Sequence, residues 1–276
     1  MNFLFWNLQK DNSFFDVICE MVKENSIGVA MFAEFPNGEQ ERLLRNLKKV
    51  NPSFRYLRSV VPAKVEVFSI LPTSELVTIR DEHRFTVKRY ISRSLNRTFN
   101  LVLCHLVSKT NDSDAESNQA EEVRYVVKAI GELEEAEGNS LTIVCGDLNM
   151  NPFEEGMVGS SCFNAVMDKT IALNLRRTVN GRDFKMFYNP MWGLLGDNGR
   201  SIVSGTYFYN PHRHVQYFWN MFDQVLIRPE VIPYFSDRYL SILTGTKSMS
   251  LLTMNHTMRT IYSDHLPIKF AIKTKK

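Results

Sequence analysis

The middle of the chain restricts the fold more than any other part of the sequence. Between residues 54 and 106 there are five runs rich in β-branched and aromatic residues, at 54–61, 64–70, 75–79, 85–90 and 98–106. No helix of normal length separates them. Consecutive strands without crossover helices pair antiparallel, because a parallel pair needs a long connection. A regular doubly wound parallel sheet is therefore excluded.

The regions on either side of this segment mix strands with helices. Residues 2–6 and 28–33 read as buried strands, each followed by a helix, the first capped within residues 11–13 and the second starting near residue 37. Residues 117–137 form the clearest amphipathic helix. Further strands are expected at 141–145, 205–209, 221–227, 239–243 and 266–272. We therefore predict an α/β fold, a four-layer α/β/β/α sandwich of two mixed, largely antiparallel sheets.

Length and composition fit one globular domain. The 276 residues can bury one large core and no Pro/Gly/Ser-rich linker divides them, so we expect a single domain over residues 1–276. The first residues lack a basic leader, so neither a signal peptide nor a membrane anchor is expected. Four cysteines show no CxxC spacing, and two lie in apolar runs, which favours a reducing, cytoplasmic location.

The distribution of charge is more informative than its sum. With 33 basic and 30 acidic residues the net charge is only +3. Basic residues nevertheless gather in 80–97 and in 176–185, and acidic residues in 112–137. Such runs form solvated faces or, in the basic case, contacts to phosphates. The basic stretches favour a polyanionic partner, and the oligomeric state stays open.

Polar side chains recur where apolar strands end. They are Asn7, Glu34, His105, Asp147, Asn149, Asp223, Asp264 and His265. Hard oxygen donors such as Glu34, Asp147 and Asp264 suit Mg²⁺ or Mn²⁺. Histidines beside them can carry protons or face developing negative charge near neutral pH. Function is therefore expected at the strand ends.

These residues stand in motifs that resemble the endonuclease/exonuclease/phosphatase superfamily, the group of deoxyribonuclease I, exonuclease III and the inositol polyphosphate phosphatases. The six matching motifs occur in the family's order: Trp6-Asn7, Phe32-Ala33-Glu34, Cys104-His105-Leu106, Gly146-Asp147-Leu148-Asn149, Phe222-Asp223-Gln224-Val225-Leu226 and Ser263-Asp264-His265-Leu266-Pro267. Each motif alone is weak. Their order over nearly the whole chain makes the resemblance specific, and it implies the deoxyribonuclease I-like fold.

The resemblance also implies roles. Glu34 corresponds to the principal ligand of Mg²⁺ or Mn²⁺, with Asn7 and Asp264 as direct or water-mediated ligands. Asp147, oriented with Asn149, corresponds to the group that aligns or deprotonates the attacking water. His265 corresponds to the contact to the scissile phosphate, held in its tautomer by Asp223. His105 corresponds to a second histidine that can protonate the leaving oxygen.

Each residue also has a structural interpretation. Glu34 can be a loop acid, Asp147 and Asp264 turn residues, and His105 a satisfied buried histidine. Glu66 is a further candidate, as an orienting partner of His105. His212 and His214 read either as part of a metal site or as a basic loop. Six aromatic residues can stack bases or pack the second sheet, namely Trp192, Tyr207, Tyr209, Tyr217, Phe218 and Trp219.

The sequence therefore predicts a metal-dependent phosphodiesterase, with a nuclease acting on DNA as the first expectation. Two alternatives stay open: a phosphatase or phosphodiesterase acting on a small or lipid-linked phosphoester, and a non-catalytic nucleic-acid-binding member. Abasic-site repair is disfavoured, because the resemblance places a tyrosine where this chain has His105. Residues 191–204 and 212–219 are expected to govern substrate choice, because loops on a rigid scaffold usually do.

Overall fold

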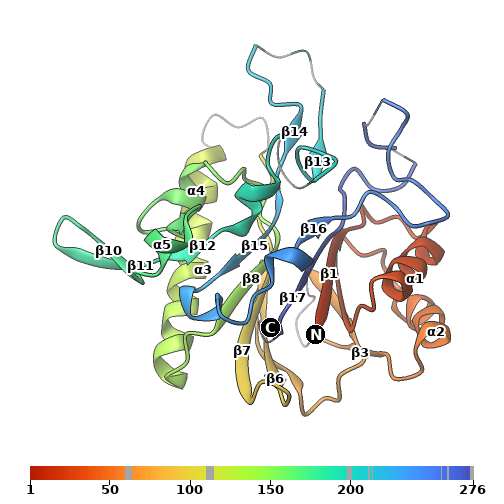
Figure 1. Ribbon diagram of the computed structural model, residues 1–276, viewed down its shortest axis with the longest axis horizontal. Helices are drawn as coiled ribbons and strands as arrows, with labels where there is room; N and C mark the ends of the chain where they lie inside the picture. The colour runs from red at the N-terminus through yellow and green to blue at the C-terminus, as the bar shows by residue number, and fades with distance from the viewer. Residues whose placement is uncertain are drawn as a thin grey trace.

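Two large sheets form the centre of the molecule (Figure 1). The computed structural model describes residues 1–59, 64–109, 115–197, 201–210, 212, 214–255, 257–259 and 261–273. The first sheet has the order β16 (Ser241–Ile242), β17 (Ile268–Ala271), β1 (Asn2–Asn7), β2 (Val29–Ala33), β4 (Val65–Ser69) and β3 (Arg55–Leu57). The second has the order β5 (Leu76–Asp81), β6 (Phe85–Ser92), β7 (Arg97–His105), β8 (Thr142–Asp147), β15 (Asp223–Ile227), β12 (Phe187–Tyr188) and β9 (Ala165–Val166).

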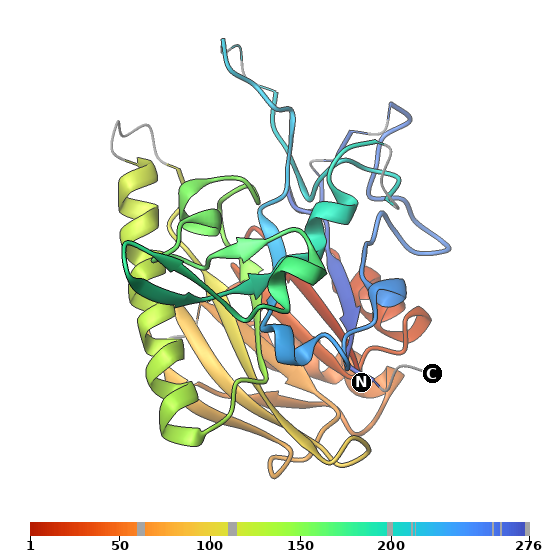
Figure 2. The ribbon, with the colours of Figure 1, turned by 60° about the vertical axis from the view of Figure 1, so that its left-hand side comes forward.

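Helices cover the outer faces of both sheets. On one side lie α1 (Phe15–Glu24) and α2 (Gln40–Val50), and on the other α3 (Ala115–Glu137) and α4 (Glu155–Val158) (Figures 1 and 2). The remaining elements are α5 (Lys169–Ala172), the 3₁₀ turns at Pro190–Leu194, Pro229–Val231 and Asp237–Tyr239, and the ribbons β10 (Arg176–Val179) with β11 (Arg182–Lys185) and β13 (Tyr207–Phe208) with β14 (Trp219–Asn220). The predicted four-layer sandwich is confirmed.

Aromatic side chains fill the space between the sheets. The ring of Phe3 on β1 stacks on Phe270 of β17 at 4.8 Å and meets Tyr90 of β6, in the opposite sheet, edge-on at 5.6 Å. A second apolar layer lies under α3, where Val123, Val126 and Ile130 are buried. Both layers follow from the sequence pattern, because continuous apolar strands are covered on both faces and α3 buries a single stripe.

Local details differ from the sequence prediction. Helix α1 begins at Phe15 without a side-chain cap, because the Asp11 carboxylate accepts the backbone N–H of Ser13 in a turn instead. Strand β3 spans only Arg55–Leu57, and residues 60 and 61 of the predicted strand lie outside the described residues. Among the described residues, the four cysteines are free and no helix has both the length and the apolar character needed to cross a bilayer.

Strand register brings the predicted polar residues to one end of both sheets. Strand β8 runs parallel to β7 and antiparallel to β15, so that Asp147 lies beside both His105 and Asp223. In the other sheet β1 runs parallel to β2, with Asn7 beside Ala33, the residue before Glu34. The carboxyl ends of parallel strands share one edge of a sheet. The two edges together make the floor of the candidate site.

Gly146 allows the close approach of β7 to β8 immediately before the site. A Cβ atom there would lie 1.9 Å from the carbonyl oxygen of Cys104, whereas one at Gly131 of α3 would meet nothing within 4 Å. Because the obstacle at Gly146 is backbone, we expect Gly146→Ala to destabilise the fold by about 3 kcal/mol or more. Gly131→Ala is expected to stabilise it by about 0.5–1 kcal/mol. Urea unfolding measures both, and equal midpoints would contradict this account.

Candidate active site

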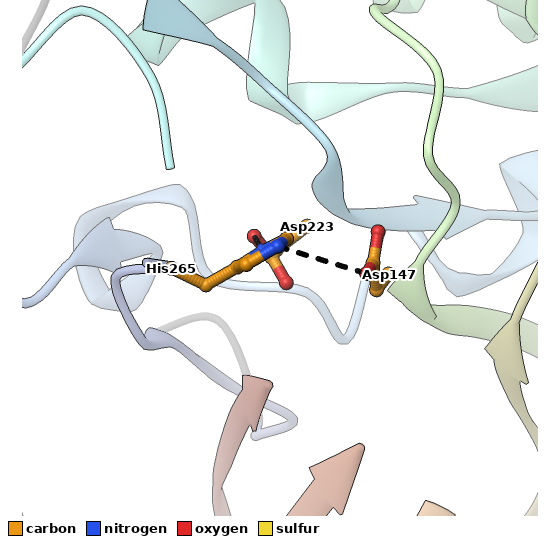
Figure 3. Close-up of side chains that lie close together, drawn as sticks. All are labelled: Asp147, Asp223 and His265. Carbon is orange, nitrogen blue, oxygen red and sulfur yellow. Dashed lines mark hydrogen bonds and ion pairs between the residues drawn. The ribbon is translucent and has the colours of Figure 1, made fainter. Parts of the chain in front are cut away.

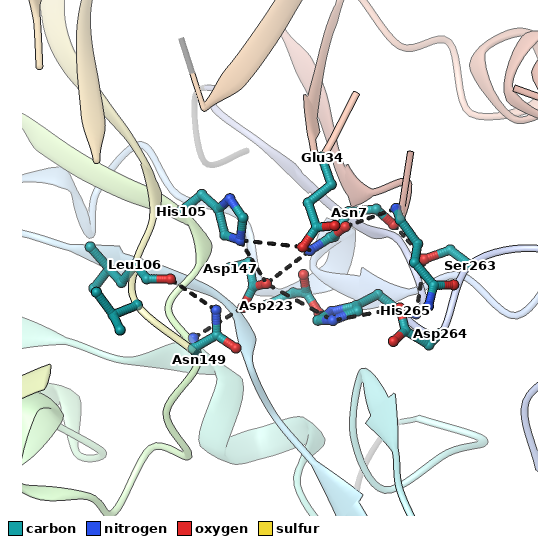
Figure 4. A network of polar contacts seen from close by, with 12 residues as sticks. Asn7, Glu34, His105, Leu106, Asp147, Asn149, Asp223, Ser263, Asp264 and His265 are labelled. Carbon is teal, nitrogen blue, oxygen red and sulfur yellow. Dashed lines mark hydrogen bonds and ion pairs between the residues drawn. The ribbon is translucent and has the colours of Figure 1, made fainter. Parts of the chain in front are cut away.

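Asp147 lies at the centre of the cluster. Its side chain is buried at the end of β8, and its Oδ2 accepts a hydrogen bond from the Asn7 amide at 2.9 Å. The same oxygen lies 3.8 Å from Nε2 of His105 and 3.9 Å from Nε2 of His265 (Figure 4). Burial raises the pKa of Asp147, and the neighbouring histidine His265 opposes that shift. One carboxylate oxygen thus faces both imidazoles.

His265 is held from several directions. Its Nδ1 lies 2.8 Å from Oδ2 of the buried Asp223 (Figure 3), which fixes the ring. Its backbone N–H donates to Oγ of Ser263, and the Trp6 indole donates to its carbonyl oxygen at 2.8 Å. Burial alone lowers the pKa of His265, but the carboxylates of Asp223, Asp147 and Asp264 outweigh burial and raise it to about 10. The imidazole is therefore a cation at neutral pH.

Glu34 and Asn7 come from the neighbouring parallel strands. Glu34 follows β2 with a positive φ of 44°, and the Asn7 amide lies 3.4 Å from its Oε1. Asn7 itself accepts the backbone N–H of Gln9 at 3.0 Å, which fixes the orientation of its amide. The Asn7 amide therefore faces the carboxylates of both Glu34 and Asp147.

His105 faces the same two carboxylates from β7. Its Nε2 lies 3.6 Å from Oε1 of Glu34, whereas its buried Nδ1 has no hydrogen-bond partner among the described residues. Burial lowers the pKa of His105, and the carboxylates of Asp147 and Glu34 offset this only in part. The pKa values of the two histidines are therefore shifted in opposite directions, down for His105 and up for His265.

Asn149 orients Asp147 through its backbone. Its N–H donates to Oδ1 of Asp147 at 3.0 Å, and it adopts a positive φ of 52°. The side-chain amide of Asn149 donates to the carbonyl oxygen of Leu106. The side-chain amide of Gln119, on α3, donates to the backbone carbonyl oxygen of Asn149. The pairing of Asp147 with Asn149 was predicted, but the main chain makes the contact.

These side chains open into one cavity of about 810 Å³. Glu34, His105, Asp147, Asp264 and His265 line its floor. Its walls carry residues from the β7–α3 connection, from the loop after β8 and from the β13–β14 region, such as Lys109, Asn151 and Tyr217 respectively. All eight sequence-predicted site residues thus lie in or directly beside one cavity.

The donors in this cavity fit a hard divalent cation. The side chains of Glu34 and Asp264 are 31% and 33% exposed, and within the described residues neither pairs with a lysine or arginine. Burial raises the pKa of Asp264, and the carboxylates of Glu34 and Asp147 add to the rise while His265 opposes it. Converging carboxylates without a lysine or arginine partner match the ligands that Mg²⁺ and Mn²⁺ prefer.

A different trio has the most closely spaced potential ligand atoms. Asp147, Asp223 and His265 each place one within 4.8 Å of the others. Two of these residues already share the hydrogen bond between His265 Nδ1 and Asp223 Oδ2. His265 keeps its proton in this trio because its pKa is raised to about 10, so the carboxylate oxygens of Glu34 and Asp264 fit a hard cation better.

The structure corrects the interpretation of Glu66. Its carboxylate accepts hydrogen bonds from Gln40 of α2 and from the Tyr56 hydroxyl of β3, at 3.2 and 2.7 Å. Glu66 therefore does not orient His105. His212 and His214 are both exposed, and neither belongs to the group of potential metal ligands found among the described residues, while the intervening Arg213 lies outside them.

Most of the first basic stretch is paired with acids and is not free to bind phosphate. Arg84 pairs with Glu122, Arg89 with Glu137, and Arg80 with Glu82 and Glu132. Lys88 is fully buried, next to Asp81 and the Thr78 hydroxyl. The acidic helix α3 supplies three of these acids, so the two oppositely charged runs largely neutralise each other. The second basic stretch forms the β10–β11 ribbon, away from the cavity (Figure 1).

Asn151 is a site residue that the sequence did not reveal. Its amide donates to Oδ1 of Asn220 at 2.9 Å, and its Oδ1 accepts the backbone N–H of Met221. It thereby ties the loop after β8 to the entrance of β15, both of which carry catalytic candidates. Its place two residues after the Gly-Asp-Leu-Asn motif and before a proline was the available signal.

Comparison with solved structures identifies the fold. No protein-family model and no curated protein matches the chain. An AP endonuclease from Archaeoglobus fulgidus is similar over 99% of both chains, with 14% identity and a TM-score of 0.59. A mannosyl-6-phosphatase from Bacteroides thetaiotaomicron is similar over 99% of both chains, with 13% identity and a TM-score of 0.57. An endonuclease/exonuclease/phosphatase family protein from Leptotrichia buccalis is also similar over 99% of both chains, with 13% identity and a TM-score of 0.57. The chain therefore has the deoxyribonuclease I-like fold of the endonuclease/exonuclease/phosphatase superfamily.

Proposed function

We propose that this protein is a metal-dependent phosphodiester hydrolase and that its substrate is nucleic acid, with DNA as the first candidate. The observation that carries the proposal is the position of Asp147 Oδ2, which lies within 4 Å of Nε2 of both His105 and His265. In-line hydrolysis needs a positioned water, stabilisation of the phosphoryl oxygens and protonation of the leaving oxygen. Three adjacent side chains offer these functions.

Each role follows from the local chemistry. Asp147, with a raised pKa and two fixed hydrogen-bond donors, aligns and deprotonates the attacking water. His265, cationic and fixed by Asp223, donates to a phosphoryl oxygen. His105, in its protonated form, would donate a proton to the leaving oxygen. Mg²⁺ or Mn²⁺ held by Glu34 and Asp264, with Asn7 as a water-mediated partner, would supply Lewis-acid stabilisation of the phosphoryl charge.

Nucleic acid is favoured over other phosphoesters by the size and lining of the cavity. About 810 Å³ exceeds what one small phosphate ester needs, and aromatic side chains line one wall. The AP endonuclease with this fold supports the same substrate class. A sugar phosphate is the second candidate, because the mannosyl-6-phosphatase shares the fold and both basic side chains of the cavity wall are paired with acids.

Metal removal tests the proposal. Purified protein is expected to degrade plasmid or oligonucleotide DNA in Mg²⁺ or Mn²⁺ and to lose that activity in EDTA. Glu34→Gln is expected to raise the metal concentration that gives half-maximal rate by about tenfold or more, because it removes a charged ligand. Gel analysis of the products provides the measurement. Cleavage that persists in EDTA would contradict the metal dependence, and intact DNA with turnover of sugar phosphates would favour the second candidate.

A further inference from the structure

One wall of the cavity is aromatic. Tyr207, Tyr209 and Tyr217 line it beside the catalytic floor, together with Phe222, which directly precedes β15. All three tyrosines belong to the aromatic arm, defined as residues 207–210, 212 and 214–220, which includes β13 and β14 and rises above the sheets (Figures 1 and 2). Trp192, in contrast, does not line this cavity.

The rings form a continuous series that starts at the catalytic histidine. The ring of Tyr207 lies 4.8 Å from that of His265, stacks on Phe222 at 5.1 Å and lies 6.2 Å from Tyr209. These separations are those of interacting aromatic pairs. Exposure increases along the series, to 46% for Tyr209, and Tyr217 is 58% exposed on the same wall. Solvent-facing ring surface therefore lies next to the site of chemistry.

Backbone hydrogen bonds fix the base of the arm against the catalytic segment. Tyr207 forms a β-bridge with His265, and the N–H of Leu266 donates to the carbonyl oxygen of Thr206 at 2.7 Å. The backbone N–H of Tyr209 donates to the carbonyl oxygen of Phe218 at 2.8 Å, which joins the two sides of the arm. The backbone of Tyr207 and Tyr209 is thus held in register with the segment of His265.

Lysine and arginine contribute little free charge to this cavity. Its one arginine and its one lysine are both engaged, Arg84 with Glu122 at 3.1 Å and Lys109 with Glu154 at 2.5 Å. Binding of duplex DNA depends mainly on basic contacts to phosphates. Base stacking on aromatic rings, in contrast, needs no free cation. The lining of the cavity therefore favours recognition of bases over recognition of the backbone.

We propose that Tyr207, Tyr209 and Tyr217 form a stacking platform for unpaired bases, which makes single-stranded nucleic acid the preferred ligand of this cavity. The inference rests on the proposed function only for placing the scissile phosphate at His265. Bases within a duplex stack on each other and have no free face for these rings, whereas bases of a single strand do.

Equilibrium binding of the full chain in EDTA tests the platform without turnover. The probe is a short fluorescent oligothymidylate, and the same strand annealed to its complement serves for comparison, both at one fixed salt concentration. Tyr209→Ala and Tyr217→Ala are each expected to raise the Kd for the single strand at least about fivefold. Tyr209→Phe and Tyr217→Phe keep the ring and are expected to keep the Kd within about twofold.

The matched control is Tyr125→Ala. Tyr125 is 52% exposed on α3 and does not line the cavity, so its removal deletes an equally exposed ring elsewhere and is expected to leave the Kd unchanged. Unchanged binding in both alanine variants of the arm would overturn the platform, as would equal affinity of the wild type for duplex. The platform would also be overturned if the phenylalanine variants lost as much affinity for the single strand as the alanine variants, because the contact would then belong to the tyrosine hydroxyls.

The proposed function is tested separately, by hydrolysis of bis(4-nitrophenyl) phosphate by the wild type. Hydrolysis without binding of the oligothymidylate would overturn the platform and leave the hydrolase standing. If mannose 6-phosphate inhibited hydrolysis by a protein that does not bind the oligothymidylate, a sugar rather than a base would be the group that contacts the aromatic wall. Binding that depends on the two rings, in a protein without hydrolysis, would support the platform and contradict the hydrolase.

Discussion

Replacing Asp147 with asparagine is expected to lower kcat for phosphodiester hydrolysis by about 10²–10⁴-fold while leaving the fold intact. Asparagine keeps the shape of the side chain and an acceptor for the N–H of Asn149. It loses the charge and basicity at the oxygen that faces Asn7 and both histidines. Initial rates at saturating substrate measure the effect, and circular dichroism checks the fold.

The matched control for this variant is Asp16→Asn, an exposed acid on α1 outside the cavity. It makes the same chemical change and is expected to leave kcat unaltered. Retention of more than about a tenth of the wild-type kcat by Asp147→Asn, equivalent to only ~1.4 kcal/mol in the barrier, would exclude the carboxylate from the proposed role.

The second large effect is expected at His265. His265→Ala removes the cation that we propose contacts the phosphate and is expected to lower kcat by about 10²–10⁴-fold. Asp223→Asn is expected to lower kcat less, because Asp223 contacts His265 through the 2.8 Å hydrogen bond and acts by positioning it. Because the two act as a unit, adding Asp223→Asn to His265→Ala is expected to cost little more.

Rates of the two single variants and the double variant decide this point. Fully multiplicative losses would contradict the coupling and leave Asp223 with an independent role. Because either single change leaves a buried polar group without its partner, thermal melting must accompany the rates. His265→Gln retains a hydrogen-bond donor toward Asp223 and separates loss of catalysis from loss of stability.

The sequence predicted which residues meet because strand ends can be read from apolar runs. Once β7 and β8 are recognised as neighbouring parallel strands, His105 and Asp147 must share an edge. The same holds for Asn7 and the residue before Glu34 on β1 and β2. Two-residue strands such as β9 and β12 carry too little periodicity to be found, so residues 153–188 could not be interpreted.

Charge pairing could not be predicted because it depends on tertiary contacts. The arginines of β5 to β7 read as a basic surface in sequence, but α3 brings Glu122 and Glu137 to Arg84 and Arg89. Glu66 was misassigned for the same reason, since its partners Gln40 and Tyr56 come from α2 and β3. The sequence located the aromatic residues of the arm, but only the structure separates those that line the cavity.

The structure places the two segments that were predicted to govern substrate choice differently relative to the cavity. Of residues 212–219, expected to govern substrate choice, Val215, Gln216 and Tyr217 line the cavity. No described residue of 191–204 does so, and residues 198–200 lie outside the described part. The difference has a topological cause, because the arm pairs with the segment of His265 whereas residues 190–194 form a 3₁₀ turn that carries no strand toward the site.

The most direct test of the central claim is hydrolysis of bis(4-nitrophenyl) phosphate, which reports phosphodiester cleavage without any requirement for base recognition. Wild-type protein in Mg²⁺ or Mn²⁺ is compared with the same protein in EDTA and with Asp147→Asn. We expect release of 4-nitrophenolate by the wild type, and its loss in both comparisons. Release that persists in Asp147→Asn, or no release by folded wild type with either metal, would contradict a metal-dependent hydrolytic site at Asp147.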